Sequence, residues 1–184
     1  RLFDITFSLI LFAFFICPSI VIAIFIKVTS KGKILYWSDR VGKNNCIFKM
    51  PKFRTMKIDT PEVATHLLLN SDDVFTPIGK LLRRYSIDEM PQLWSIFVGN
   101  MSFVGPRPAL FNQDDLIQLR SNYGVDVLLP GLTGWAQING RDDLQINDKV
   151  KKDLEYLNRR SFLFDIKIIC LTIVKVFKKD GITH

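Results

Sequence analysis

The chain has 184 residues, enough for about one domain, and 48% of them are hydrophobic. Its formal net charge of +7 at pH 7 favours anionic partners, such as phosphorylated substrates or lipid headgroups. The sequence has no groove-reading motif and no aromatic RNA-binding signature, so we expect no nucleic-acid partner.

Cysteine and histidine usage excludes several other classes of protein. Cys17, Cys46 and Cys170 are far apart and lack metal-site spacing, which argues against a disulfide framework and fits a reducing cytoplasm. His66 and His184 lie in no recognisable motif. A histidine-based catalytic triad or a histidine-rich zinc site is therefore not expected.

The first predicted element is an apolar helix. Ile5 to Ile26 carries no charged side chain, and as a straight helix it would be about 33 Å long, enough to span a bilayer core. Pro18 predicts a kink near the middle, because proline removes a backbone donor and clashes with the preceding turn. A kinked helix can cross the bilayer, or it can enter one leaflet and return to the same face. The residues alone favour crossing, and basic residues at both ends of the run give no clear orientation.

A β-hairpin is predicted after a short polar linker. Lys33–Trp37 and Cys46–Met50 have strand-like composition, and Val41–Asn45 between them is typical of a hairpin turn. Lys52–Met56 then alternates basic and apolar residues.

Helices are predicted next. Residues 57–77 are polar and irregular, with a short helix expected over Pro61–Asn70 because proline suits the first position of a helix. Ile78–Arg84 predicts a second helix. Ser86 is expected to cap a third helix over Ile87–Val98.

The centre of the chain is interrupted by prolines and glycines. Gly105–Pro108 excludes regular structure, and residues 109–123 predict a helix. Pro130–Trp135 is expected to be a turn-rich loop, followed by a short strand over Ala136–Asn139.

Two helices are predicted in the last third of the chain. Asp148–Asn158 is a charged helix, and Phe162–Phe177 places apolar side chains on one face with lysines around them. The second pattern suits an amphipathic helix at a membrane interface, and packing on the domain core explains it equally well.

The adjacent carboxylates Asp88 and Glu89 are the first candidates for chemistry. Ser86-x-x-Glu89 has the form of a capping box, which would give both acids a purely structural role. Arg83 and Arg84, just upstream, favour the other interpretation because they would keep Asp88 ionised.

An ionised carboxylate at this position can act on a phosphate. It can attack phosphorus and form an acyl phosphate, while its neighbour holds Mg²⁺. Adjacent helical residues point about 100° apart, so Asp88 and Glu89 can divide these two roles.

Basic residues elsewhere are candidates for binding the substrate phosphates. Arg107 lies between two prolines, and a stiff backbone suits a guanidinium that must meet a phosphate with two hydrogen bonds. Lys52 and Arg54 are further candidates, and Arg141 is a weaker one. For each of them a solvated surface side chain is the alternative.

Asp153 and Tyr156 are the remaining candidates for substrate binding. They are three residues apart and share one face of a predicted helix. On spacing alone, a solvated or packing face explains the pair equally well or better.

Taken in order, these segments resemble the bacterial sugar transferase family, the monotopic phosphoglycosyl transferases. The resemblance covers nearly the whole chain. It rests on the head interrupted by Pro18, Lys52–Met56, Ser86–Leu93, Met101–Pro108, Pro130–Arg141, Asp153–Tyr156 and Ser161–Asp165.

The resemblance implies a reaction and a set of roles. Family members move a sugar 1-phosphate from a UDP-sugar onto polyprenol (undecaprenyl) phosphate and release UMP. By this resemblance Asp88 is the nucleophile that forms a covalent phosphosugar intermediate, Glu89 holds Mg²⁺, and Arg107 binds phosphate. The polyprenol phosphate then attacks the intermediate in a ping-pong scheme.

The resemblance also implies a fold and a location. We expect an α+β, mostly helical protein with a short β-hairpin and amphipathic interfacial helices. Residues 1–27 would form a re-entrant helix hairpin broken at Pro18, which reverses the preference for crossing, and residues 28–184 a catalytic domain on the cytoplasmic face of the bacterial inner membrane. Two positions depart from the family's usual pattern: Asn100 stands where aspartate is common, and Leu129 where a basic residue is common.

Two other functions remain open from the sequence. The chain could be a non-catalytic module that binds anionic lipid through its basic residues, or a phosphohydrolase of polyprenol diphosphates. The transferred sugar is not encoded in any recognisable motif.

Overall fold

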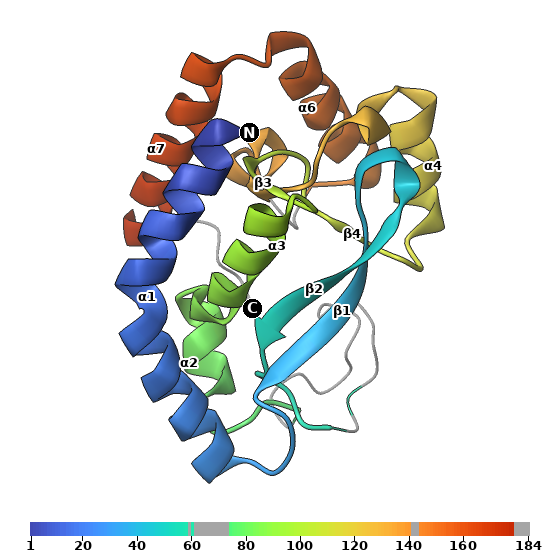
Figure 1. The fold of residues 1–184 in the computed structure, drawn as a ribbon. Helices are drawn as coiled ribbons and strands as arrows, with labels where there is room; N and C mark the ends of the chain where they lie inside the picture. The colour runs from blue at the N-terminus through green and yellow to red at the C-terminus, as the bar shows by residue number, and fades with distance from the viewer. Residues whose placement is uncertain (59, 61–73, 141–143, 179–184) are drawn as a thin grey trace.

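The fold is α+β and mostly helical, with a short β-hairpin, as predicted (Figure 1). The computed structural model describes all residues except 59, 61–73, 141–143 and 179–184. The helix predicted over Pro61–Asn70 falls outside the described residues.

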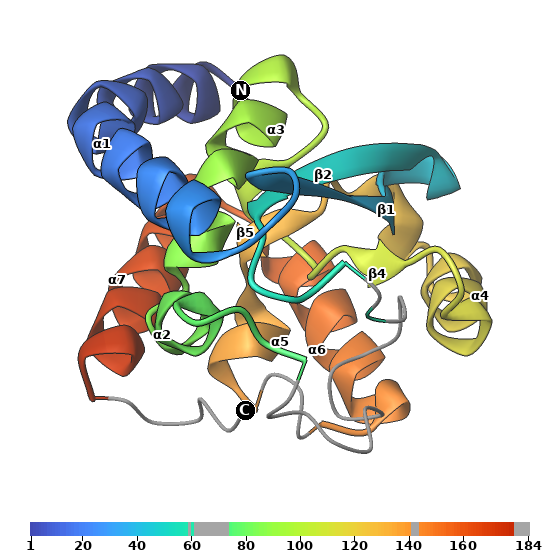
Figure 2. The same ribbon diagram turned by 90° about the horizontal axis from the view of Figure 1, so that it is seen from below.

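The apolar head forms one helix, α1 (Leu2–Thr29), with Pro18 inside it. Figure 2 shows that α1 changes direction part-way along its length, as expected for a helix that contains proline. By length and composition it is able to cross a membrane. Its re-entrant path stays a prediction.

Both ends of α1 contact the rest of the chain. At the N-terminal end, the buried Asp4 carboxylate accepts hydrogen bonds from the Ser102 hydroxyl (3.0 Å) and the Phe103 amide (3.2 Å). At the C-terminal end, Ile26 is fully buried in a cluster with Phe53 and Leu82. The helix therefore lies along the domain over its whole length.

The predicted hairpin is confirmed. Strand β1 (Leu35–Val41) pairs antiparallel with β2 (Ile47–Phe53), and a 3₁₀ turn, η1 (Lys43–Asn45), joins them. The other edge of β1 pairs with β4 (Ala109–Leu110). This pairing ties the segment after Gly105–Pro108 to the hairpin.

The prediction for residues 130–139 was wrong. Gly131–Thr133 forms strand β5, which pairs in parallel with β3 (Ser102–Val104), and Trp135–Ile138 forms a short helix, α5. A Cβ atom on Gly131 would collide with the backbone of Gly105, so glycine allows this close approach. A partner strand about 30 residues away decides the structure here, and local composition does not reveal it.

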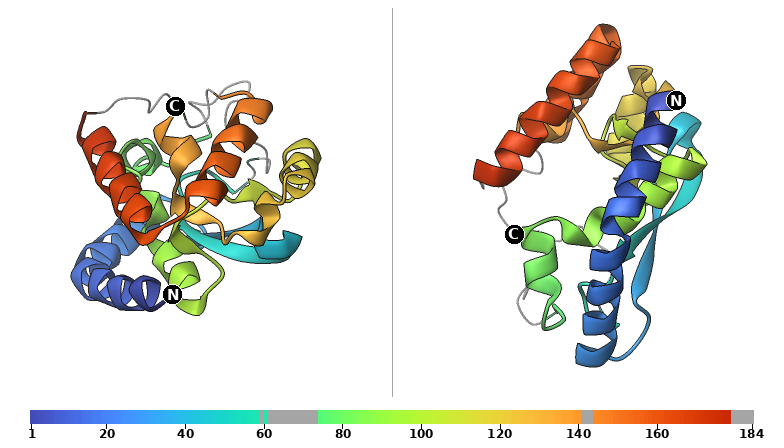
Figure 3. Two further views of the ribbon diagram at one scale, coloured as in Figure 1. Left: turned by 90° about the horizontal axis from the view of Figure 1, so that it is seen from above. Right: turned by 60° about the vertical axis from the view of Figure 1, so that its left-hand side comes forward.

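The C-terminal helices are close to their predicted positions. They are α6 (Ile146–Arg159) and α7 (Phe162–Lys178). The helix predicted over residues 109–123 is shorter, because β4 takes its first residues and α4 (Asp114–Asn122) begins later. Figure 3 shows α7 on the same side of the molecule as α1, and α4 on the opposite side.

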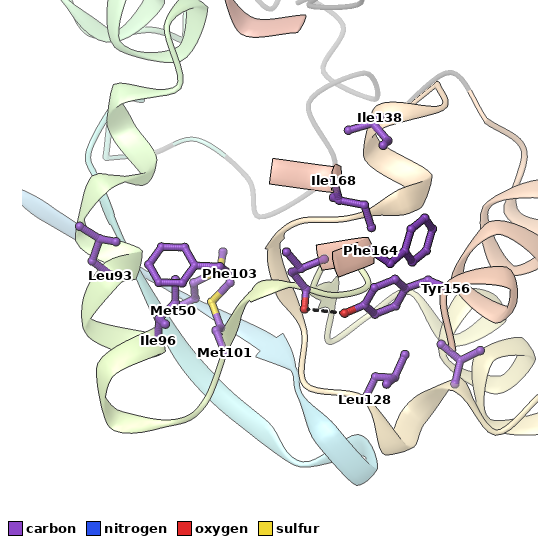
Figure 4. Packing of buried hydrophobic residues seen from close by; sticks show 12 residues of the cluster. Met50, Leu93, Ile96, Met101, Phe103, Leu128, Ile138, Tyr156, Phe164 and Ile168 are labelled. Atoms are coloured by element: carbon purple, nitrogen blue, oxygen red, sulfur yellow. Dashed lines mark hydrogen bonds between the residues drawn. The ribbon is translucent and has the colours of Figure 1, made fainter. Parts of the chain in front are cut away.

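The main core joins the hairpin to the C-terminal helices (Figure 4). Met101 and Ile96 are fully buried at one end of the cluster, and Tyr156, Phe164 and Ile168 lie at the other. Burial of an apolar side chain of this size stabilises the fold by about 1.5–3 kcal/mol. This core holds the segments that carry the candidate site in fixed relative positions.

Large apolar side chains remain exposed on α1 and α7. On α1 they include Leu9, Ile10, Phe14, Ile16, Ile20, Val21, Ile24 and Phe25, and on α7 Phe162, Leu163, Ile173 and Val174. The free cysteines Cys17 and Cys170 are exposed on the same two helices. An exposed apolar surface of this extent marks an interaction site rather than ordinary solvent contact.

Candidate active site

Asp88 and Glu89 lie in a short 3₁₀ helix, η3 (Ile87–Gln92), between α2 (Gly79–Arg84) and α3 (Leu93–Val98). The single helix predicted over Ile87–Val98 is therefore split in two. Pro91 accounts for the split, because in an α-helix its ring would clash with the carbonyl of residue 87.

The predicted capping box was wrong. Ser86 makes no side-chain hydrogen bond to the helix start, and its backbone is left-handed (φ 54°, ψ 23°), whereas an N-cap residue takes an extended conformation. The Glu89 carboxylate contacts Lys52 instead of the Ser86 amide. The Glu89 side chain therefore does not cap the start of the helix.

Lys52, Glu89 and Arg107 form the charged centre of the site. Lys52 Nζ of β2 donates to Glu89 Oε1 at 2.9 Å, and Arg107 Nη2 lies 3.6 Å from the same oxygen. Arg107 belongs to the loop between β3 and β4. Three segments that are distant in the chain therefore meet at one carboxylate oxygen.

Asp88 is buried beside this centre, with 5% of its surface exposed. Burial raises its pKa to about 6, and the charge of Glu89 adds to this effect, while Lys52, Arg83 and Arg107 act in the opposite direction. Near neutral pH the carboxylate is mainly ionised but poorly solvated. This state suits a nucleophile.

Lys52 is affected by the same burial. Desolvation lowers its pKa, and the carboxylates of Glu89 and Asp88 oppose the change. The two acids that the buried ammonium group faces therefore offset only part of its desolvation cost.

A small hollow opens beside Glu89. Its lining comes from the hairpin, η3, the Pro106–Pro108 loop and β5, and consists of Arg40, Met50, Lys52, Glu89, Gln92, Arg107, Pro108, Gly131 and Leu132. The three cations against one carboxylate give the hollow a net positive charge that suits a phosphate group. Arg40 and Gln92 were missed by the sequence analysis, although Gln92 lies inside the Ser86–Leu93 motif.

The structure brings Arg83 near the site and places Arg84 apart from it. Arg83 acts electrostatically on Asp88, and its guanidinium lies 5.4 Å from the centre of the Phe75 ring. Arg84 is exposed and lies 6.0 Å from the Tyr85 ring centre.

Arg54 is directed at α1 rather than at the charged centre. Its buried guanidinium donates to the Ser30 hydroxyl (2.7 Å), the Ser30 carbonyl (3.0 Å) and the Lys31 carbonyl. In this structure Arg54 fixes the end of α1 to the domain.

Asp153 and Tyr156 are buried and bound to other residues of the chain. Asp153 Oδ2 accepts hydrogen bonds from Arg120 Nε (3.0 Å) and Nη2 (2.7 Å), and Tyr156 donates to Asp165 Oδ1 (2.7 Å). Their role in substrate binding remains a prediction. Arg141 lies outside the described residues.

The carboxylates present fit a magnesium ion that is shared with a substrate. Within residues 1–58, 60, 74–140 and 144–178, no group of three or more His, Cys, Asp or Glu side chains could hold an ion. Mg²⁺ usually binds through one or two carboxylates together with substrate phosphate oxygens, and Glu89 supplies one carboxylate beside Asp88. The donor set therefore suits a metal that arrives with a diphosphate.

Comparison with known proteins identifies the family. The family model described as "Bacterial sugar transferase" matches residues 1–179. The chain belongs to this family, and the resemblance inferred from its motifs is confirmed.

Relatives in several bacteria match most of this chain. The chain is 38% identical over 99% of its length to the "Uncharacterized sugar transferase EpsL" of Bacillus subtilis, and it covers 89% of that protein. It is 40% identical over 85% of its length to the UDP-glucose:undecaprenyl-phosphate glucose-1-phosphate transferase of Escherichia coli, and 33% identical over 98% to the undecaprenyl-phosphate galactose phosphotransferase of Salmonella typhimurium. It spans only 35% and 41% of the lengths of the latter two proteins.

Proposed function

We propose that this transferase moves a sugar 1-phosphate from a UDP-sugar to undecaprenyl phosphate and releases UMP. The observation that carries the proposal is the buried Asp88 beside Glu89, whose carboxylate contacts Lys52 and Arg107 at the edge of a positively charged hollow. The names of the relatives from Escherichia coli and Salmonella typhimurium support the acceptor and the transferred group.

In the first step a carboxylate oxygen of Asp88 attacks the phosphorus that carries the sugar. A bond forms between this oxygen and phosphorus, the bond from phosphorus to the UMP oxygen breaks, and UMP leaves. Lys52 and Arg107 stabilise the negative charge on the diphosphate. The pKa of about 6 for Asp88 supports this role, because the group is ionised at neutral pH without a full hydration shell.

In the second step an oxygen of the lipid phosphate attacks the same phosphorus. The bond to Asp88 breaks, which restores the carboxylate and yields the polyprenol diphosphate sugar. Both displacements use one site, so UMP must leave before the lipid phosphate enters. This order is the ping-pong scheme expected from the sequence.

Glu89 would hold Mg²⁺ in this site. When the donor is bound, the ion would act as a Lewis acid and neutralise part of the negative charge of the diphosphate. Because Lys52 and Arg107 already contact Glu89, the carboxylate must be shared between these cations and the ion.

The contacts of α1 support a re-entrant path, with both ends on the side of the membrane where the domain lies. Arg1 donates to the Ile96 and Phe97 carbonyls (both 2.7 Å) at one end, and Ser30 contacts Arg54 at the other. A helix whose two ends contact the same domain cannot place those ends on opposite sides of a bilayer. The exposed apolar side chains of α1 and α7 then face lipid, and the active site lies at the level of the lipid phosphates.

Release of UMP tests the proposal directly. Purified protein is incubated with Mg²⁺, undecaprenyl phosphate and a panel of UDP-sugars. We expect release over many turnovers that requires the lipid and one particular donor. With that donor and no lipid, we expect no more than one equivalent of UMP and a protein mass raised by one sugar phosphate.

Other outcomes point to other functions. Binding to anionic vesicles without UMP release from any donor would indicate a non-catalytic module. Release of inorganic phosphate from undecaprenyl diphosphate without a nucleotide sugar would indicate a phosphohydrolase.

A further inference from the structure

The loop that carries Arg107 is held by hydrogen bonds at three successive carbonyl groups. The Pro106 carbonyl accepts from the Gly131 amide (2.9 Å), the Arg107 carbonyl from Arg120 Nη1 (2.9 Å), and the Pro108 carbonyl from Arg40 Nη1 (3.2 Å). The donors come from β5, α4 and β1. Three elements thus hold a loop whose prolines already restrict the backbone.

The central donor, Arg120, is itself fixed by a carboxylate. Its Nε and Nη2 atoms both donate to Asp153 Oδ2, and its third nitrogen, Nη1, reaches the Arg107 carbonyl. Arg120 is 8% exposed and Asp153 is 1% exposed. One planar guanidinium therefore links α6 to the backbone of the residue whose side chain faces Glu89.

We propose that Arg120 and Asp153 are positioning residues that direct Arg107 into the active site. This inference rests on the proposed function for its effect on transfer, but the geometric link itself does not depend on that function. In this role Asp153 acts only through Arg120, from which it accepts two hydrogen bonds, and it needs no contact with the substrate. A displacement of about 1 Å in a positioning group can lower the rate about 100-fold.

Three variants separate positioning from simple destabilisation. Arg120→Lys keeps a cation for Asp153 but loses the rigid fork that also reaches the Arg107 carbonyl. The double variant Arg120→Met with Asp153→Leu removes both buried charges, so neither is left unpaired. Val150→Ala is the matched control, because Val150 is 1% exposed and packs α6 against the same region without joining the chain of hydrogen bonds.

The first measurement is independent of turnover. Phenylglyoxal modifies accessible arginines, and mass spectrometry of the peptide that contains Arg107 gives its labelling rate. We expect Arg107 to react severalfold faster in Arg120→Lys and in the double variant than in the wild type or in Val150→Ala. Unchanged labelling in the first two variants, or an equal rise in Val150→Ala, would overturn the proposal.

The second measurement tests the effect on transfer. We expect kcat/KM for the sugar donor to fall about 10- to 100-fold in the double variant. We also expect no further loss when Arg107→Ala is added, because both changes remove the same contact. Additive losses would show that Arg120 and Asp153 act without Arg107.

The two measurements also separate the two proposals. A wild-type protein that transfers no sugar phosphate from any donor would refute the proposed function. The labelling rates of Arg107 would still decide whether Arg120 and Asp153 hold the loop.

Discussion

Asp88 and Asp153 are 5% and 1% exposed, and cationic side chains lie near both. Asp153 accepts two hydrogen bonds from Arg120, whereas Asp88 accepts no hydrogen bond from the residues that the structure describes and has Glu89 beside it. The aspartate carboxylate at position 153 is thus saturated with hydrogen-bond donors, whereas the one at position 88 keeps available lone pairs. A carboxylate with satisfied acceptors stabilises a fold, and one without them is available to a substrate.

The largest expected effect is the loss of turnover in Asp88→Asn. An amide cannot replace an ionised nucleophile, so we expect kcat to fall on the order of 10⁴-fold, as for other essential groups that act in covalent catalysis. The measurement is UMP release, with vesicle binding as the control for correct folding. Turnover within tenfold of the wild type would rule out Asp88 as the nucleophile.

The opposite result is expected for Asp153→Asn, where folding rather than chemistry is affected first. The change leaves the Arg120 guanidinium buried without its carboxylate, and breaking a buried pair in this way costs about 3–5 kcal/mol. Thermal or urea unfolding in detergent measures the difference. A loss below about 1 kcal/mol would mean that the pair is more solvated than the structure indicates.

The stability of the protein should fall with rising pH as Asp88 ionises. Its pKa is raised from 3.8 to about 6, so the folded state binds the proton more tightly than the unfolded state does, and ionisation destabilises the fold as pH rises through this window. Asp88→Asn removes the ionisation and should stabilise the protein by about 2–3 kcal/mol at pH 8. The gain should vanish below about pH 4, where the wild-type group is protonated in both states.

The same pKa predicts the pH profile of the reaction. Wild-type kcat/KM should rise with pH through about 6 as Asp88 ionises. A stability gain in Asp88→Asn that does not change with pH would assign the destabilisation to packing instead of charge.

The sequence predicted that Asp88 and Glu89 are the catalytic pair, which stays a prediction, but it did not predict the contacts that surround them. The motif Ser86–Leu93 and the stiff loop around Arg107 pointed to the correct segments, because proline and adjacent acids are visible in a sequence. The contact of Lys52 with Glu89 joins residues 37 positions apart, and the link from Asp153 to Arg107 passes through Arg120. Such contacts depend on the packing of whole elements, which local patterns do not encode.

The helices followed their periodicity, and the errors lie where long-range pairing or proline overrides it. α6 and α7 agree with their predicted ranges to within two residues at each end. β5 lies where a loop was predicted, and α5 lies where a strand was predicted. β5 forms because it pairs with β3. η3 departs from a regular helix because of Pro91, and this short 3₁₀ helix contains the candidate carboxylates Asp88 and Glu89.

The smallest expected effect concerns Ser86, which sets the direction of η3. If Ser86 capped a helix, replacing it by alanine or glycine would cost stability, about 1 kcal/mol for alanine. In the structure its side chain caps nothing and its φ is 54°, a conformation that glycine adopts without strain. We therefore expect Ser86→Gly to stabilise the protein by about 1 kcal/mol, and Ser86→Ala to have little effect because alanine keeps the strain and loses no cap.

Urea unfolding of the two Ser86 variants in detergent, with the slope compared as well as the midpoint, distinguishes the two conformations. Destabilisation of both variants, larger for alanine than for glycine, would support the capping box and a structural role for Glu89. A gain for glycine alone would support the left-handed turn that directs Asp88 and Glu89 away from the helix start and toward Lys52. The contrast between an available and a saturated carboxylate would then trace back to a single strained residue at the start of η3.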